Sequence, residues 1–333
     1  MEKLIPNLIL LVFANCVFGQ QNISSIAVGS CSHEYDKDQM WPEIIAEDPG
    51  LFIWTGDIIY GDTHDMNILR KKYDTQKSHS DYQQLLKTIP VIGVWDDHDY
   101  GTNDGGKYYT KKRESKEALL DFLDVPANAP VRDHEGVYQA YTFGAAPHEV
   151  RVIILDCRYF RDTLKMSEGT GKRYEPNPQG DVLGEEQWTW LESELRNSGA
   201  ALNIIISSIQ VLAAEHNFEK WANFPKARKR LLNLITMVKP NPTFFISGDR
   251  HIAELSRLEL EGLPYPLFDF TASGLTHTWS SAWEEKNSLR IGEIIIQKNY
   301  GLIQLDWSSD RPKVTFRVKG DDRVEYMKYI HDY

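Results

Sequence analysis

The chain has 333 residues, of which 41% are hydrophobic and 11% aromatic, so it can hold one large domain or two small ones with a substantial core. Lys and Arg number 37 against 48 Asp and Glu, which gives a formal net charge of −11. This charge disfavours nonspecific binding to nucleic acid or to an anionic membrane. An anionic substrate would therefore need a local positive charge, such as a bound metal.

The first 21 residues, MEKLIPNLILLVFANCVFGQQ, have the pattern of a secretory signal peptide. Lys3 precedes an apolar run over residues 4–18, and small residues precede the polar turn that follows. The run is too short and too interrupted for a membrane span, and a buried first strand is the alternative interpretation. We expect residues 1–19 to be a signal peptide and residues 20–333 a single domain. The mature protein would then lack a transmembrane span and be secreted or held in the secretory lumen.

One glycosylation sequon and three cysteines bear on the same question. Asn22, in Asn-Ile-Ser, is the acceptor of the sequon. Cys16 would leave with the signal peptide, so Cys31 and Cys157 remain, and a disulfide between them is the ordinary expectation in an oxidising compartment. Each of the two follows an apolar run, "IAVG" or "VIILD". Each is therefore predicted at the C-terminal end of a core strand, where the sites of α/β sheets gather.

Short β-type runs alternate with helical patterns along most of the chain, which indicates a layered α/β protein. The predicted strands cover residues 26–28, 51–54, 91–94, 137–143, 150–155, 202–207 and 243–246, and the predicted helices cover residues 40–46, 81–87, 115–123, 185–197 and 225–238. Four later β-type runs, at 253–260, 267–271, 301–307 and 314–318, have no long helix between them and predict a second sheet, mixed or antiparallel. Residues 167–181 form a Gly/Pro-rich segment that is typical of a long surface loop.

Side chains that can bind metals follow four of these strands. They are Cys31 at the end of "AVGSC", Asp57 and Tyr60 in "FIWTGDIIY", Asp96, Asp97, His98 and Asp99 in "IGVWDDHD", and Asp249 and His251 in "FFISGDRH". An acidic turn after one strand is ordinary, but the ends of several strands of one sheet converge on one crevice. Carboxylates gathered there would repel one another, so the pattern indicates bound cations or shared protons.

These segments resemble the motifs of the alkaline phosphatase D (PhoD)-like family of the metallophosphoesterase superfamily. "GDIIY" is similar to the Gly-Asp-x-x-Tyr motif that this family shares with purple acid phosphatases. "WDDHD" stands where metallophosphoesterases carry Gly-Asn-His-Glu/Asp, and "SGDRH" stands where they carry Gly-His-x-His. The cysteine after "GS" and the two aspartate replacements together are the PhoD-like pattern. The resemblance extends over residues 26–307 and implies an α/β/β/α sandwich of two mixed sheets flanked by helices.

The resemblance also implies two metal sites that share one carboxylate. The first would consist of Cys31, Asp57, Tyr60 and His251 and is expected to hold Fe³⁺. Asp57 would bridge to a second ion, expected to be Ca²⁺, held also by Asp97 and Asp249. The donor types agree, because thiolate, phenolate and imidazole suit a transition metal and an all-oxygen site suits a hard cation. Zn²⁺, Mn²⁺ and Mg²⁺ are the alternatives.

The implied reaction is hydrolysis of a small phosphomonoester or phosphodiester by metal-activated hydroxide, with Asp57, Asp97 and His98 as catalytic residues. By the family pattern His98 would contact the substrate and protonate the leaving group, and Asp96 or Asp99 would orient it. Arg158 is a weaker candidate for a contact with a phosphate oxygen. A further block, "SSIQ", is similar to the family block that ends in histidine and has Gln210 in its place.

Competing interpretations exist for the function and for single residues. A phospholipase D-like phosphodiesterase and a non-catalytic secreted binding protein that contains metal are the alternative functions. His98 separates the binding protein from an enzyme, because a structural metal site needs no unliganded histidine beside it. For single residues, the alternatives are a Cys31–Cys157 disulfide, Tyr60 as a core aromatic, and His98 as an ion-paired residue of a surface turn.

Overall fold

The computed structural model describes residues 22–169, 173–309 and 311–333. The expected signal peptide, residues 1–19, and Cys16 lie outside the described residues. Within the described part, no helix combines the length and the apolar character needed to cross a membrane.

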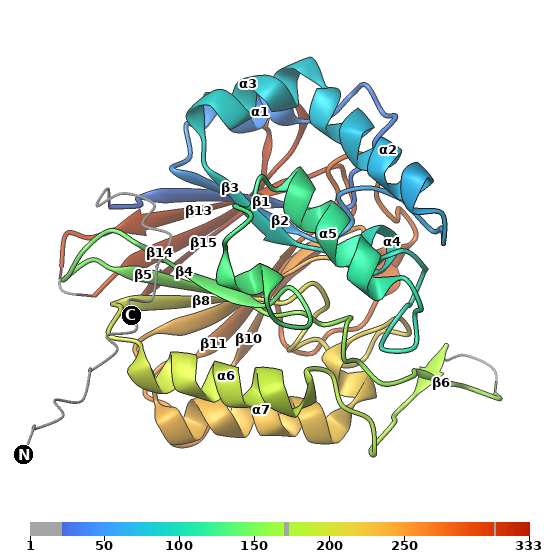
Figure 1. Cartoon of the computed structure of the whole chain (residues 1–333). Coiled ribbons are helices and arrows are strands. Elements are labelled where there is room, and N and C mark those ends of the chain that lie inside the picture. Colours follow the sequence, from blue (N-terminus) through green and yellow to red (C-terminus); the bar gives the residue numbers. More distant parts are fainter. Residues whose placement is uncertain (1–21, 170–172, 310) are drawn as a thin grey trace, which may run out of the picture.

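Two mixed β-sheets pack face to face and are flanked by helices on both outer sides (Figure 1). The six-stranded sheet has the order β15-β14-β13-β1-β2-β3, with β1 (Ser25–Gly29), β2 (Leu51–Thr55), β3 (Val91–Val94), β13 (Tyr300–Asp306), β14 (Lys313–Lys319) and β15 (Glu325–Asp332). The seven-stranded sheet has the order β12-β10-β11-β9-β8-β5-β4, with β4 (Gln139–Phe143), β5 (Val150–Ile154), β8 (Leu202–Ile206), β9 (Thr243–Ser247), β10 (Ala253–Leu258), β11 (Leu267–Ala272) and β12 (Arg290–Ile295). The structure confirms the predicted α/β/β/α class.

Helices cover the outer face of each sheet (Figure 1). They are α1 (Trp41–Ala46), α2 (Met66–Ser78), α3 (Ser80–Thr88), α4 (Asp97–Tyr100) and α5 (Lys112–Phe122) on the side of the six-stranded sheet, and α6 (Gly184–Asn197) and α7 (Pro225–Val238) on the other. Helix α6 begins with Glu185 and Glu186 in its first turn, where the helix dipole favours negative charge. Helix α7 begins at Pro225, whose ring fixes a helical φ and whose missing N–H would have had no partner there.

The register of the first three strands sets the position of the site. Strands β1, β2 and β3 are parallel, and Gly29, Trp54 and Gly93 lie side by side across them. The loops that follow the three strands therefore leave the sheet at one edge. In the second sheet β5, β8, β9 and β11 are also parallel, so their C-terminal ends likewise share an edge.

The sequence predicted that the four late β-type runs form a second sheet, and this prediction is wrong. Strands β10 and β11 join β9, and β13 and β14 join β1, so the late strands extend both sheets. Apolar alternation identifies a strand but not its pairing partner, which is the reason for this error. Helix α2 and strands β12 and β15 were not predicted. Only three residues of α2 are buried, and β15 is a half-exposed edge strand, so both have weak apolar patterns.

The segment predicted as a long loop over residues 167–181 contains part of a small hairpin. Strand β6 (Lys165–Met166) pairs with β7 (Tyr174–Glu175), and residues 170–172 lie outside the described part.

The sandwich contains two hydrophobic cores. The first lies between the sheets and under α1, α3 and α5, and Phe316 of one sheet contacts Phe244 and Phe270 of the other at ring-centroid distances of 5.1 and 5.4 Å. The second lies between the seven-stranded sheet and α6 and α7, where Trp188 and Trp221 are fully buried. Both faces of the seven-stranded sheet are thus packed, which leaves its strand ends as the place for a site.

Candidate metal centre

Each predicted metal-ligand segment lies directly after a strand, and three of the four contain a residue with a positive φ. Cys31 follows β1, Asp57 follows β2, and Asp249 and His251 follow β9. These four residues have φ values of 58°, 48°, 69° and 54°, in the left-handed region that non-glycine residues seldom adopt. Such conformations cost free energy and concentrate at functional sites. Four of the six predicted metal ligands are thus held in this strained conformation.

Two glycines allow the loops from different strands to come together. A Cβ atom on Gly248 would lie 2.5 Å from the carbonyl oxygen of Thr55, and one on Gly56 would lie 2.4 Å from Cβ of Asp96. Gly56 also has a φ of 102°, which a side chain would disfavour. Only glycine therefore permits the close approach of β9 to β2, and of β2 to the loop after β3.

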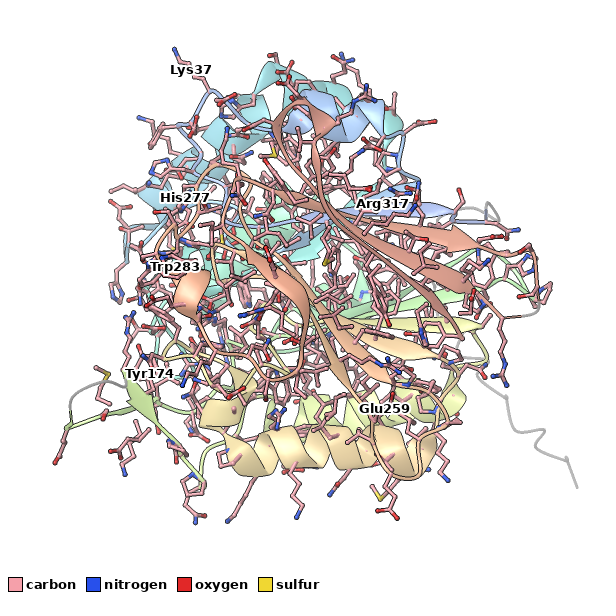
Figure 2. All side chains as sticks on the ribbon, turned by 180° about the vertical axis from the view of Figure 1, so that it is seen from behind. Lys37, Tyr174, Glu259, His277, Trp283 and Arg317 are labelled. Carbon is pink, nitrogen blue, oxygen red and sulfur yellow. The ribbon has the colours of Figure 1, made fainter. Side chains whose placement is uncertain are left out.

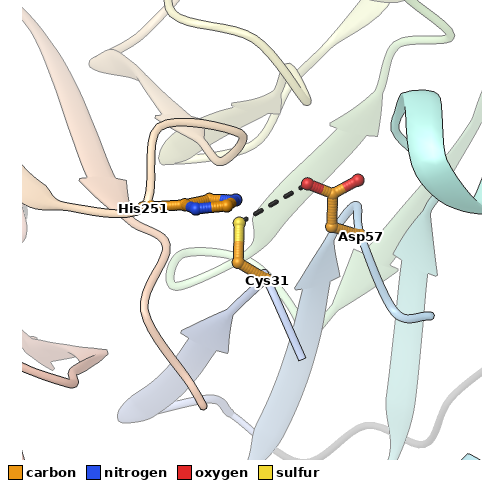
Figure 3. A group of neighbouring side chains, drawn as sticks. All are labelled: Cys31, Asp57 and His251. Atoms are coloured by element: carbon orange, nitrogen blue, oxygen red, sulfur yellow. Dashed lines mark hydrogen bonds between the residues drawn. The ribbon is translucent and has the colours of Figure 1, made fainter. Parts of the chain in front are cut away.

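The first group of candidate ligands consists of Cys31, Asp57 and His251 (Figure 3). One ligand atom from each residue lies within 4.8 Å of the others, and the thiol of Cys31 donates to Asp57 Oδ2 over 3.5 Å. Tyr60 adjoins the group, with its hydroxyl 3.0 Å from His251 Nε2. The structure thus brings together the four residues predicted for the first metal, and their role as ligands stays a prediction.

Tyr60 is held in place by a residue that the sequence analysis did not single out. Its backbone N–H donates to Glu34 Oε2 over 3.0 Å, and the buried carboxylate of Glu34 pairs with Lys72. Tyr60 is therefore anchored through its backbone while its hydroxyl reaches His251. This arrangement differs from that of a core aromatic whose hydroxyl bonds to the backbone.

The second group of candidate ligands is made entirely of carboxylates, from Asp57, Asp96, Asp97 and Asp249. One oxygen from each lies within 4.8 Å of the others. Asp57, Asp96 and Asp97 are buried, and Asp249 is partly buried. Asp96 was not predicted as a ligand, and both of its carboxylate oxygens accept bonds of 2.7 Å from Arg158. The three carboxylates left for a cation are the predicted ones.

This concentration of negative charge changes the pKa values of the group. Burial, followed by the charge of Asp97, raises the pKa of Asp57 well above its ordinary value. Burial and the charges of Asp96 and Asp97 raise the pKa of Asp249 in the same way. Burial also acts on Asp97, but the positive charges of Arg158 and His98 outweigh it and lower the pKa of Asp97 to about 2. The carboxylates are thus incompletely neutralised by the protein.

The pKa shifts favour a protonated thiol, a protonated phenol and a neutral imidazole in the first group. Burial and the charges of Asp57 and Asp249 raise the pKa of the Cys31 thiol well above its ordinary value. Burial and the charge of Cys31 raise the pKa of Tyr60. Burial and two neighbouring histidines lower the pKa of His251 to about 3, so its imidazole is neutral and able to bind a metal.

The donor set fits a pair of cations. Asp57 Oδ1 is buried and has no hydrogen-bond partner among the described residues, which leaves an acceptor at the point where the two groups meet. A bound cation would satisfy this oxygen and neutralise the surrounding carboxylates. Asp57 belongs to both groups. The first group also has the thiol and the imidazole, with the phenol beside them, and the second has only carboxylates, which matches the predicted division between a transition metal and a hard cation.

His98 lies beside the carboxylates but has a different partner from the one expected. Together with Asp57 and Asp97 it forms a third group within 4.8 Å, and its side chain is 18% exposed. Its Nδ1 atom lies 2.7 Å from Asp62 Oδ2. Burial would lower the pKa of His98, but this bond and the charges of Asp97 and Asp57 raise it to about 11.

Asp96 and Asp99 do not orient His98, contrary to the sequence-based expectation. Asp96 pairs with Arg158, and Asp99 accepts the backbone N–H groups of Ile58 and Asp96 over 3.2 and 2.6 Å. Asp99 thus joins the loops after β2 and β3. The contact that holds the imidazole comes from Asp62, which belongs to a different loop.

Arg158 is fully enclosed by protein acceptors. Its guanidinium makes two bonds to Asp96 and one of 2.6 Å to Glu219, and its side chain has no exposed surface. This arrangement disfavours the predicted contact with a phosphate oxygen, because the side chain is already committed to two carboxylates. Arg250 is likewise committed, since it makes bonds of 2.7 and 2.6 Å to Glu285.

The two cysteines of the described part are free and buried. Cys157 Sγ lies 3.4 Å from the hydroxyl of Ser207, so the alternative Cys31–Cys157 disulfide is wrong. Gln210 donates to the side chains of Glu254 and Thr271 over 2.7 and 2.8 Å. Its amide nitrogen is therefore used within the seven-stranded sheet.

Comparison with known proteins agrees with this geometry. The model of the PhoD-like phosphatase family matches residues 26–286. The chain belongs to this family. Alkaline phosphatase D of Bacillus subtilis (strain 168) is 22% identical over 215 residues, which cover 58% of this chain and 36% of that protein. The chain thus spans little more than a third of this curated relative.

A solved structure described as the structure of PhoD shares the fold of this chain. The two superpose with a TM-score of 0.74 over 94% of this chain and 69% of the other, at 19% sequence identity. The match confirms the predicted fold class, and at this identity it shows the fold alone.

Two histidines of this PhoD-like family member were missed by the sequence analysis. The rings of His33 and His277 lie 5.6 and 5.1 Å from the ring of Tyr60, and His277 lies 4.5 Å from His251. Both follow the ends of strands, in "SCSH" and "SGLTH". The same rule of polar residues after a strand end could have found them, whereas the link between Asp62 and His98 has no signal in the sequence.

Proposed function

We propose that this protein is a metal-dependent hydrolase of phosphomonoesters or phosphodiesters. The observation that carries the proposal is the unbalanced carboxylate group beside a thiol, a phenol and an imidazole, with His98 at its margin. Membership of the PhoD-like phosphatase family supports a phosphate-ester hydrolase. The substrate would be a small phosphate ester, and no specific binding to nucleic acid is expected.

Two cations would be held by the residues that the sequence singled out. Cys31, Asp57, Tyr60 and His251 would hold the first, expected to be Fe³⁺, and Asp97 and Asp249 would share the second, expected to be Ca²⁺, with Asp57. Zn²⁺, Mn²⁺ and Mg²⁺ stay as alternatives. When bound, the cations would neutralise the phosphoryl oxygens and lower the pKa of the attacking water.

The protein's own residues would act on the leaving group and on the geometry of the centre. In hydrolysis the oxygen of water forms a bond to phosphorus while the bond to the ester oxygen breaks. Asp62 keeps His98 protonated, and the imidazolium would give its proton to the departing oxygen. Arg158 would hold Asp96 away from the cation, so that Asp97 alone of the pair serves as ligand.

The cellular context of the proposal follows from the N-terminal sequence. Residues 1–19 would be the signal peptide of a secreted protein, and residues 20–333 would form a single domain. The side chain of Asn22 is exposed, which supports glycosylation at its sequon.

The test is hydrolysis by the mature protein, secreted from eukaryotic cells and loaded with iron and calcium. We would compare a chromogenic phosphomonoester with the matching diester and use Asp57→Asn as the inactive control. Hydrolysis by the wild type that is lost in the control is expected, and preference for the diester would name a phosphodiesterase. A folded, metal-loaded protein that hydrolyses neither ester would contradict the proposal and favour a binding protein.

A further inference from the structure

The exposed tryptophans of this chain lie in one short segment. Five of the nine tryptophans are fully buried, and two more are partly buried. The two exposed ones, Trp279 and Trp283, lie in residues 276–285, with exposed fractions of 40% and 64%. A large indole surface left in water is costly, so the position of both exposed tryptophans in one segment calls for an explanation.

This segment, residues 276–285, forms a wall of the metal centre. The backbone N–H of Trp279 donates to the carbonyl of His251 over 2.8 Å, and the hydroxyl of Thr276 donates to the carbonyl of Cys31 over 3.2 Å. His277 lies between Thr276 and Trp279 in the chain, and its imidazole contacts the rings of His251 and Tyr60. Figure 2 shows His277 and Trp283 along the same edge of the molecule.

Trp279 is fixed by a series of contacts that starts beside the candidate ligands. Its ring meets that of Phe218 in a T-shaped contact with centroids 4.3 Å apart. The guanidinium of Arg250 lies 4.4 Å from the centroid of the Phe218 ring, and Arg250 in turn is paired with Glu285 at the end of the segment. Because Arg250 stands between Asp249 and His251 in the sequence, the aromatic pair is tied to the centre on two sides.

The contacts hold Trp279 without covering it. A T-shaped contact hides only part of an indole, and the 40% exposure of the residue leaves aromatic surface available to a ligand. Trp283, by contrast, makes no ring contact with another aromatic residue among the described residues. Trp279 is thus the exposed tryptophan whose position is determined by the surrounding structure.

We propose that Trp279 and Phe218 form an aromatic subsite that binds the planar organic group of the phosphate ester. This inference rests on the proposed function and goes beyond it, because it names the substrate class as esters with an aryl or other flat aromatic group. A planar group can stack on an indole face or meet a ring edge, and loss of such a contact weakens binding by about tenfold. Small alkyl esters would reach the metal centre without making this contact.

The test compares aryl and alkyl esters in the metal-loaded full chain. Trp279→Ala should lower kcat/KM for phenyl phosphate about tenfold, mainly through a higher KM, and leave ethyl phosphate nearly unchanged. Trp279→Phe should retain most of the preference, and Trp283→Ala should behave as the wild type with both esters. If diesters are preferred, the phenyl and ethyl diesters replace these two. Equal losses on both esters, or no loss on either, would overturn the subsite.

A binding measurement separates this inference from the proposed function. Phenylphosphonate and methylphosphonate are not esters, so their affinities, measured by calorimetry, do not depend on turnover. The wild type should bind phenylphosphonate more tightly, and Trp279→Ala should remove that difference. This result would support the subsite even in a protein that hydrolyses neither ester. Equal affinities in the wild type, or no binding of either, would overturn it.

Discussion

Asp96 and Asp97 are neighbours in the chain, but their environments differ in how negative charge is balanced. Asp96 belongs to a buried ion network with Arg158, Glu219 and Arg161, in which each carboxylate faces a guanidinium. Asp97 belongs with Asp57 and Asp249, and none of these three forms an ion pair with a Lys or Arg within the described residues. Buried carboxylates that are balanced by arginine therefore support the fold, whereas unbalanced carboxylates are available to a cation.

The sharpest test of this comparison is Asp57→Asn, which changes the residue common to all the candidate groups. We expect kcat/KM of the metal-loaded protein to fall by about 10³- to 10⁴-fold, because the carboxylate would bridge both cations. In chelator the variant should unfold at the same temperature as the wild type or a higher one, since a repulsive buried carboxylate is gone. Full activity together with normal metal content would refute the bridging role.

The opposite result is expected in the balanced network. Arg158→Met leaves Asp96 buried without its guanidinium partner and Glu219 with Arg161 alone, and it should lower the free energy of unfolding by about 3–5 kcal/mol. The measurement is urea unfolding in the presence of chelator. Arg113→Met is the matched control, because Arg113 pairs with Glu135 but is 76% exposed, and its loss should leave the urea midpoint nearly unchanged. Similar midpoints for the two variants would show that the network does not stabilise the fold.

His98→Ala tests the residue at the margin of the unbalanced group. Loss of the proton donor should lower kcat by about 10²- to 10³-fold while the metal content per chain stays the same. His64→Ala, which removes an exposed histidine of the loop after β2, is the control and should keep full activity. A variant that lost its metals as well would place His98 among the ligands instead.

Asp62→Asn is expected to have the smallest effect and to change the pH profile. Asp62 raises the pKa of His98, so its removal lowers that pKa, and the imidazolium is then lost at lower pH. The alkaline limb of kcat should therefore move to lower pH, with a loss of about tenfold under alkaline conditions. Asp65→Asn is the control, since Asp65 caps α2 and an asparagine can do the same. An unchanged profile would show that Asp62 does not act through His98.

Much of the fold and of the candidate centre follows from local sequence patterns. The runs that became β1, β2, β3 and β9 were predicted within two residues, because each combines an apolar stretch with a polar turn. The residues after them were predicted to converge because parallel strands of one sheet end at one edge. In the structure β9 belongs to the other sheet, so the residues after β9 come from a different sheet from those after β1, β2 and β3. The ligand assignment came from the family resemblance, and it stays a prediction.

The sequence did not show which residues far apart in the chain pair with one another. Arg158 was predicted to meet phosphate, yet it lies against Asp96 and Glu219, which are 62 and 61 residues away in the chain. The partner of His98 was predicted among its own neighbours, yet it is Asp62, 36 residues away. The late strands were assigned to a sheet of their own for the same reason, since a strand pattern does not name its partner.

The sequence by itself determined most of the strands and helices, and most of the polar residues that stand at the strand ends. These properties depend on side chains that are close together in the chain, and the periodicity of the apolar ones can be recognised without a structure. Only the tertiary structure decided which of these polar residues are balanced by arginine, which are left for a cation, and which aromatic ring is left exposed beside them. Those outcomes depend on distances between loops of different strands, which the packing of the two sheets sets.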